Sequence, residues 1–508
     1  MSTKAGELHL LAPHNGNIVV LLALLYKLLV AVFGLGTQLP FRLVIGITLA
    51  CLGALVFVLV RERMGLLVAV AATAVVLFLG PAWEVTLFFA AFSHLGPVTL
   101  GVAALLALEV DTPKRNAAAC ILLVCATLLG NPAIAFVIGA TIAIALRRRP
   151  AELWITAIPA ALFVLWWLFY GREQPSGVSM HNIVHLPHYV LNSISIGLAS
   201  ITGLNHGAPP VALNRGHILV VVLALALVVR LIRGGRPGSW ILVIGGTALA
   251  FWALTGAGYM FGREPYASRY QLADGVFLIL IGAELLRGTA LPRALSVLIA
   301  VAALGVVVAN LLALSTGFVF MRREAGYVKA DLGALQVAGS RAPARLWLVQ
   351  PVARDGFLSG VTAGRYFAVT RAHGTPPYDT LAQIAAAPAD QRQSVDSVLV
   401  AAYGIAPQPI LGRAGLAACP RLAATTAPAG PERALAAGAT VIWDLSTTPL
   451  VVRVRRFAPP ELTVPVGFLA GRSAARIVIP PDTVAQPWRL SIENPRRVPG
   501  VEVSVCGP

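Results

Sequence analysis

The stretch FRLVIGITLACLGALVFVLV, Phe41–Val60, contains twenty residues and a single charge, Arg42. A helix of about 20 apolar residues is long enough to cross the ~30 Å hydrocarbon layer of a bilayer. Further runs with almost no charge follow in the first 320 residues: Ile155–Tyr170, Ile218–Ile232, Leu242–Leu254 and Ala294–Leu314. Because so many runs occur in series, the sequence predicts a multi-pass membrane protein rather than the buried helices of one large soluble core.

The overall composition agrees with a membrane protein. Hydrophobic residues make up 57% of the 508 residues and charged residues only 12%, whereas soluble domains carry about 25% charged residues. The net charge of +17 could suit nucleic acid, but no basic stripe interleaved with aromatic residues occurs. We therefore expect membrane lipid, and not nucleic acid, as a partner.

Basic residues follow alternate apolar runs and predict a topology. The clusters are Arg61/Arg63, Lys114/Arg115, Arg147–Arg149, Arg230/Arg233/Arg236 and Arg287/Arg293. The positive-inside rule places these loops in the cytoplasm. About ten spans result, near 39–60, 65–81, 86–108, 116–130, 131–146, 152–170, 217–232, 239–258, 269–287 and 293–318. We expect Asn17–Gly34 to lie in the outer interface, and Tyr189–Leu204 to be an interfacial or re-entrant helix.

The composition changes after Met321, where we expect a soluble domain on the outer side of the plasma membrane. Residues 1–320 would then form the transmembrane domain. Residues 321–439 read as mixed, with strand or mixed elements at Arg345–Val352 and Phe357–Val369 and a helix near Thr380–Ala387. Residues 440–508 predict a small β-sandwich. Its six short runs are Val441–Leu445, Leu450–Phe457, Thr463–Leu469, Ala475–Ile479, Trp488–Ile492 and Val501–Val505.

The cysteines divide into two groups. Cys51, Cys120 and Cys125 lie in apolar runs and are expected to pack as small hydrophobic side chains. Cys419 and Cys506 are the two cysteines of the outer domain, where an oxidising compartment favours a disulfide between them. No CxxC or Cys/His metal spacing occurs.

Three histidines of an outer loop are candidates for metal ligands. His181, His185 and His188 have near-helical spacing, but Pro187 interrupts the helix and no carboxylate accompanies them. A divalent metal therefore has no support in the sequence, and we expect no metal site.

The most specific segment is PHNGNIVVLLALLYKLLVAVFGLGTQLPFRLVIGITLACLGALVFVLVRERMG, Pro13–Gly65. It resembles the part of GT-C type membrane glycosyltransferases that follows their first outer loop. The chain is also similar to a group of actinobacterial GT-C-like membrane proteins. These share an "APHNGH" segment, a "WE" outer loop (here Trp83-Glu84), an "SRY" element (here Ser268-Arg269-Tyr270) and a C-terminal domain that ends in Cys. The resemblance implies a GT-C-like helical domain and sugar transfer from a polyprenyl phosphate.

The sequence departs from that pattern at its start. GT-C enzymes carry a catalytic Asp or Glu in the first outer loop, after a first transmembrane helix. Here only Glu7 precedes Pro13, and Asn17 stands where the related group tends to have His. We expect either that the natural chain begins further upstream or that this copy has lost its base.

Inverting sugar transfer needs a carboxylate to take a proton and cations to neutralise the leaving phosphate. Glu84, in a short outer loop, is the best remaining carboxylate. The expected substrate-binding residues are His14, Asn15, Arg263, Arg269 and Tyr270, and Asp274 is expected to face the protein interior. Each also has a structural interpretation: Trp83-Glu84 as an interfacial pair, His14-Asn15 as part of a turn, and the arginines and Tyr270 as interface anchors.

Three functions remain open at this point. The first is a membrane glycosyltransferase that uses a polyprenyl-phosphate sugar and acts on an envelope glycan at the outer face. The second is a catalytically inactive GT-C-like protein that binds or scaffolds envelope glycans. A transporter is the weakest, because no pair of Gly/Pro-interrupted helices occurs in corresponding halves. Beyond the lipid-linked donor, the sequence indicates no certain cofactor.

Overall fold

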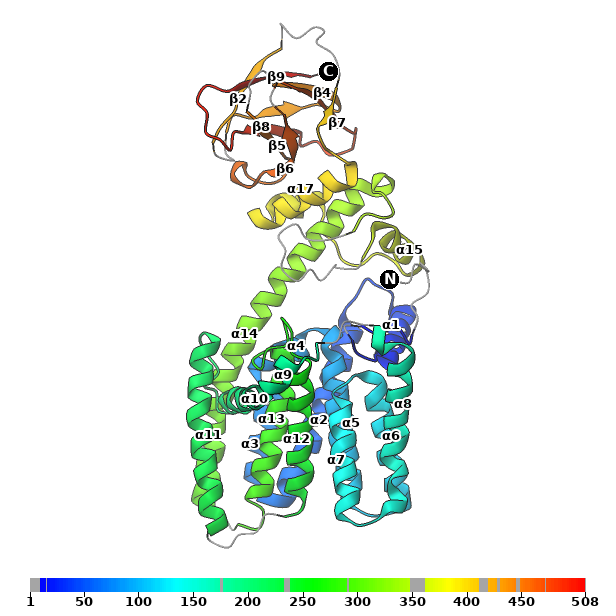
Figure 1. The fold of residues 1–508 in the computed structure, drawn as a ribbon, viewed down its shortest axis with the longest axis vertical. Helices are drawn as coiled ribbons and strands as arrows, with labels where there is room; N and C mark the ends of the chain where they lie inside the picture. Colours follow the sequence, from blue (N-terminus) through cyan, green and yellow to red (C-terminus); the bar gives the residue numbers. More distant parts are fainter. Residues whose placement is uncertain are drawn as a thin grey trace. The chain divides into compact units, whose positions relative to one another are not determined.

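The computed structural model describes residues 10–14, 16–173, 177–232, 238–289, 292–347, 361–410, 419–426, 430–444, 448–470 and 472–507. The chain divides into two units. The first contains Met1–Val32 and Gln38–Phe320, and the second contains Phe33–Thr37 and Met321–Pro508. The first is helical, and the second combines helices with strands (Figure 1).

The first unit is built from helices that run mostly alongside one another (Figure 1). They are α1 (Val20–Phe33), α2 (Leu39–Met64), α3 (Leu66–Leu77), α4 (Trp83–Leu87), α5 (Phe92–Glu109), α6 (Pro113–Leu129), α7 (Ala133–Leu146), α8 (Trp154–Phe169), α9 (Met180–Val184), α10 (Leu186–Ile201), α11 (Pro209–Ile232), α12 (Trp240–Ala257), α13 (Ser268–Leu285) and α14 (Arg293–Ala338), the last of which contributes to both units.

Six helices in the described part of the chain are long and apolar enough to cross a membrane, which indicates a membrane protein. They cover Leu39–Met64, Leu66–Leu87, Phe89–Glu109, Pro209–Val229, Trp240–Ala257 and Arg293–Arg341. The expected number of ten spans is not confirmed. The other four predicted spans fall on α6, α7, α8 and α13. The first three have 17, 14 and 16 residues, short of the roughly 20 that a full crossing needs.

Helix α13 lies at the centre of this unit. Thirteen of its 18 residues are buried, including the polar Gln271, Asp274 and Glu284. Gln271 donates to the carbonyl of Pro265 and accepts from the Ser200 hydroxyl on α10. Because α13 packs against other helices, it can carry buried polar residues. Its sequence is therefore less apolar than that of its neighbours.

Helix α14 approaches the rest of the first unit very closely at two points. A Cβ at Gly80 would overlap the backbone carbonyl of Asn310, and a Cβ at Gly317 would overlap the ring of Trp83. Trp83 also lies 5.3 Å from the ring of Phe320. Elsewhere the helix is largely uncovered, with only 6% of its apolar stretch buried.

Arg63, one of the basic residues at the end of the first predicted span, is not exposed to solvent. Its guanidinium is buried at the end of α2, where it pairs with Glu284 of α13 and Glu109 of α5. Arg287 lies 3.6 Å from the second oxygen of Glu284. A buried cation persists only with such partners, so Arg63 joins three helices.

The second unit begins with helices that follow α14. They are α15 (Ala363–His373), α16 (Leu381–Ala386) and α17 (Ala389–Tyr403). The predicted helix near Thr380–Ala387 is confirmed by α16, where Thr380 and Gln383 form a capping box. The strand or mixed element expected at Phe357–Val369 is wrong over residues 363–369, because Thr362 caps the helix α15. Residues 348–360 lie outside the described residues.

Two antiparallel sheets complete this unit. The order in the five-stranded sheet is β1 (Gln408–Pro409), β7 (Ala474–Ile479), β4 (Gly438–Asp444), β9 (Glu502–Cys506) and β2 (Arg421–Ala423). In the other it is β3 (Arg433–Leu435), β8 (Trp488–Glu493), β5 (Leu450–Arg455) and β6 (Val464–Leu469). All six predicted runs are strands, and their apolar faces share one core. Strands β1 to β3 precede residue 440, so the sheets begin earlier than expected.

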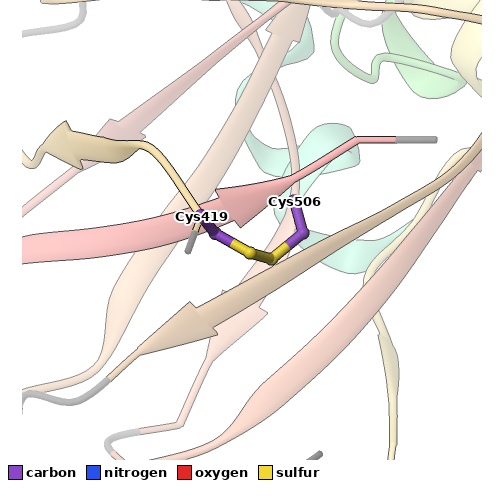
Figure 2. The surroundings of a disulfide bond; sticks show 2 residues. All are labelled: Cys419 and Cys506. Atoms are coloured by element: carbon purple, nitrogen blue, oxygen red, sulfur yellow. A yellow bond between two sulfur atoms is a disulfide. The ribbon is translucent and has the colours of Figure 1, made fainter. Parts of the chain in front are cut away.

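Two interactions link segments of this unit that lie far apart in the chain. The Asp396 carboxylate of α17 accepts hydrogen bonds from the backbone N–H groups of Arg456, Phe457 and Ala458. Burial raises the pKa of Asp396 to about 6, although these N–H groups act in the opposite direction. Figure 2 shows the second interaction, a disulfide between Cys419 and Cys506, whose Cα atoms lie 5.1 Å apart.

Candidate functional site

Glu84 and Arg269 meet where α4 lies against the start of α13. The carboxylate Oε2 of Glu84 lies 3.5 Å from Nε of Arg269, and both side chains are partly exposed, at 20% and 34%. The backbone N–H of Glu84 donates to the hydroxyl of Ser268 at 3.0 Å. The backbone of Arg269 also hydrogen-bonds to the Glu84 carboxylate. An anion at a helix N-terminus is favoured by the unpaired N–H groups there.

His94, in the first turn of α5, is a residue that the sequence interpretation missed. Its ring lies edge-on to that of the buried Tyr270 at 5.7 Å. Its Nδ1 is buried and has no hydrogen-bond partner among the described residues. The positive charges of Arg269 and Arg263 both act on this imidazole. The signal in the sequence was a single ionisable residue in an apolar run, which is costly in a membrane and therefore informative.

Arg263 lies beside the N-terminal turn, His14–Asn17. Its Nη2 lies 3.9 Å from the position of a Cβ on Gly16, and its Nη1 donates to the carbonyl of Gly258. The carbonyl of Arg263 accepts a hydrogen bond from the Tyr189 hydroxyl at 3.0 Å. His14 is bridged to Asn17 by two backbone hydrogen bonds, and Asn15 lies outside the described residues. The sequence predicted both segments as substrate-binding, but not that Arg263 would lie next to this turn.

Asn131 fixes the N-terminal turn from the loop between α6 and α7. Its amide Nδ2 donates to the carbonyl of Gly16 at 3.0 Å, and its Oδ1 accepts from the N–H of Ile18 at 3.3 Å. Trp166 adds a third tie, because its Nε1 donates to the carbonyl of Leu11. A side-chain amide that satisfies two backbone groups over a separation of more than 100 residues is a positioning device. Sequence reasoning missed it as well.

Asp274 faces the interior, being 1% exposed. Its Oδ1 accepts a hydrogen bond from Trp252 Nε1 at 2.7 Å, and the interior position agrees with the prediction. The indole lies on α12, one helix away in the chain, so its approach depends on tertiary packing. Asp274 thus secures two central helices.

The three candidate histidines, His181, His185 and His188, do not share one set of partners. The rings of His181 and His185 are 4.2 Å apart, whereas His188 bonds to Asn192, which in turn bonds to His217. Within the described ranges, no group of three His, Cys, Asp or Glu side chains is arranged to hold a metal ion.

The candidate site comprises a carboxylate, two guanidinium groups, an imidazole and a phenol from four separate segments. Guanidinium groups can bind phosphate oxygens through paired hydrogen bonds. A carboxylate nearby can accept a proton from a hydroxyl. The arrangement therefore has the functional groups for chemistry between an alcohol and a phosphate ester.

Comparison with known proteins provides no independent assignment, since no protein-family model and no curated protein matches the chain.

Proposed function

We propose that this protein is a membrane glycosyltransferase that moves a sugar from a polyprenyl-phosphate donor to an envelope glycan at the outer face of the plasma membrane. The observation that carries the proposal is the pairing of Glu84 with Arg269, next to the His94 ring that packs against Tyr270 and on which the charges of Arg263 and Arg269 both act. The resemblance of the Pro13–Gly65 segment to GT-C enzymes supports the same reaction.

The reaction assigns each charged group a task. Glu84 takes the proton from the acceptor hydroxyl as the acceptor oxygen forms its bond to the anomeric carbon. The bond between that carbon and the phosphate oxygen breaks, and its electron pair leaves with the polyprenyl phosphate. Arg263 and Arg269 neutralise the developing charge, which is where preorganised cations contribute most to rate.

Arg269 would then change partners during the cycle. Without donor it pairs with Glu84 at 3.5 Å, and a carboxylate engaged with a cation is less accessible to an acceptor hydroxyl. A donor phosphate competes for the same guanidinium, so that binding of the donor releases the base when it is needed.

The test uses the full-length protein in lipid nanodiscs with a panel of radiolabelled polyprenyl-phosphate sugars and envelope glycan acceptors. We expect sugar transfer by the unaltered protein and a loss of at least 100-fold in Arg269→Ala. Arg115→Ala, which removes an exposed cation from the start of α6, is the matched control and should retain activity. Transfer that survives Arg269→Ala would contradict the proposed site.

A second candidate is a catalytically inactive protein that binds or scaffolds envelope glycans. It is favoured by the contacts of Glu84, whose carboxylate and backbone N–H both bond to the first turn of α13. A carboxylate with these structural contacts can hold two helices together without acting as a base. Binding of envelope glycan by the folded protein, with no transfer from any donor of the panel, would support this candidate over the enzyme.

A further inference from the structure

The exposed charged residues of the second unit are predominantly basic. Residues 321–508 contain 20 basic and 12 acidic residues, yet the exposed ones are far less balanced. Only two exposed residues of the described part are acidic, Glu461 and Glu502. Thirteen are basic: Arg322, Arg323, Lys329, Arg341, Arg345, Arg365, Arg371, Arg421, Arg472, Arg476, Arg489, Arg496 and Arg497. A field of one sign over a whole surface attracts partners of the opposite sign.

The imbalance arises because most acidic side chains are buried or paired with arginines inside the fold. Asp331, Asp396 and Asp444 are at most 1% exposed. Further carboxylates are taken up by internal arginines, in the pairs Arg453–Glu493, Arg455–Glu432 and Arg456–Asp482. Nine exposed arginines accordingly have no carboxylate within ion-pair distance in the described residues: Arg322, Arg341, Arg345, Arg365, Arg371, Arg472, Arg476, Arg496 and Arg497.

Two of these arginines occupy unusual backbone positions. Arg472 has φ 57° and Arg497 has φ 55°, a left-handed conformation that glycine and asparagine adopt far more readily than arginine. The turn at Arg497 is fixed by Asn494, whose carbonyl accepts from the N–H of Arg497 and whose Nδ2 donates to the carbonyl of Val498. The left-handed backbone places both guanidinium groups on exposed turns, where they are open to a ligand.

Both turns lie at the same end of the five-stranded sheet. Arg472 stands two residues before Ala474, which pairs with Trp443 at the end of β4. Arg497 lies in the turn that leads to β9, whose Val503 pairs with the next residue of β4, Asp444. Together with Arg496 these residues form a group that we call the sheet-end arginines (Arg472, Arg496 and Arg497).

We propose that the second unit binds an anionic envelope polymer, one whose repeating units carry carboxylate or phosphate groups, through the sheet-end arginines. The guanidinium fork matches both of these anions. A polymer suits the sheet-end arginines better than a single small anion, because they come from two separate turns, one before β7 and one before β9. The Cys419–Cys506 disulfide is typical of an oxidising compartment, which favours an envelope polymer over nucleic acid. The proposal is independent of sugar transfer in the first unit.

The experiment measures binding of fluorescein-labelled hyaluronate and of polyglycerol phosphate to the full-length protein in nanodiscs of neutral phosphatidylcholine, over a series of salt concentrations. One variant combines Arg472→Asn, Arg496→Gln and Arg497→Asn, with asparagine chosen to tolerate the left-handed positions. The matched control combines Arg341→Gln, Arg345→Gln and Arg365→Gln. It removes an equal number of positive charges from the part of the unit that precedes the sheets.

We expect at least a tenfold loss of affinity for hyaluronate, polyglycerol phosphate or both in the sheet-end variant. Its log-affinity against log-salt slope should fall by about one unit for each arginine that no longer binds an anionic group, by analogy with other polyanions. The control should lose less than threefold.

Equal losses in the two variants would overturn the proposal, as would absence of binding to both polymers. Stronger binding to phosphatidylglycerol vesicles or to single-stranded DNA than to either polymer would likewise overturn it, and assign the surface to those partners. An intact disulfide and an unchanged unfolding temperature would show that both variants are folded.

Discussion

The Glu84 carboxylate lies 3.5 Å from Nε of Arg269, while the backbone N–H of Glu84 bonds to the hydroxyl of Ser268. One residue of α4 therefore binds the first turn of α13 through both its main chain and its side chain. The same carboxylate is the proposed proton acceptor. Its structural and chemical contributions can be separated by substitutions that remove one and leave the other.

Replacing Glu84 with Gln should reduce sugar transfer by about 10² to 10⁴-fold, the usual effect of removing a general base. Gln retains an oxygen that can accept from the α13 backbone, so the unfolding temperature should change little. Ser268→Ala is the counterpart, since it removes the hydroxyl that accepts from Glu84 and should cost about 1 kcal/mol of stability with little effect on rate. Transfer at the original rate in Glu84→Gln would refute the role of Glu84.

Arg63→Met should destabilise the first unit by about 3–5 kcal/mol, because it leaves the carboxylates of Glu109 and Glu284 without their buried partner. Thermal unfolding in one detergent measures the effect. Arg61→Gln is the control, since Arg61 is exposed and lies over the ring of Phe57 at 5.9 Å, so it should cost less than about 1 kcal/mol. Equal midpoints for the two variants would show that the buried network does not stabilise the fold.

The Cys419–Cys506 disulfide closes a loop of 87 residues, and the loop-entropy relation then predicts a contribution of about 4 to 5 kcal/mol. Replacing both cysteines with Ser should lower the unfolding temperature of the second unit accordingly. Titration of the unreduced, denatured protein should find only the thiols of Cys51, Cys120 and Cys125. Five reactive thiols in protein prepared without reductant would contradict the pairing.

Asp396 should make the second unit less stable as the pH rises. Burial raises its pKa to about 6, from an ordinary value of 3.8. The folded state consequently binds more protons than the unfolded state between these values, so that its contribution is complete below about pH 4 and lost as the pH passes 6. Chemical denaturation at pH 4 to 7 measures this slope, which Asp396→Asn should flatten. A slope unchanged by that substitution would exclude Asp396 as its source.

The proposed topology predicts that position 147 is cytoplasmic and position 185 is outside. Single cysteines introduced there, in a protein whose Cys51, Cys120 and Cys125 have been replaced, would be treated with a membrane-impermeant reagent in intact cells. We expect labelling of His185→Cys and protection of Arg147→Cys. The reverse pattern would invert the arrangement.

Local patterns predicted the elements of this protein better than the interactions between them. The strands β4 to β9 follow from alternating apolar residues, because burial of one face is visible in the sequence itself. Helix α17 was missed, since its buried side includes Ser394 and Asp396, whose partners Asp331 and Arg456 lie about 60 residues away in the chain. Polar residues buried by distant partners look like loop residues in a sequence.

The candidate site shows the same division. Glu84 and Arg269 were each singled out as ionisable groups at the ends of predicted spans, where such groups are costly. His94 and Asn131 were not, because their significance depends on which helices pack together. The burial of Arg63 was not predicted for a related reason, because it depends on the approach of Glu109 and Glu284 from two other helices.

The two close contacts of α14, at Gly80 and Gly317, have a consequence for handling the protein. Where Gly80 meets the carbonyl of Asn310 and Gly317 meets Trp83, there is no space for a larger residue, and most of the remaining apolar stretch is uncovered. Its other neighbours in a membrane are lipid chains, which supply packing that the polypeptide does not. Bilayer thickness and lipid saturation therefore act as part of this helix's folding environment, and short-chain detergents that replace the lipids should loosen α14 before they disturb the buried α13.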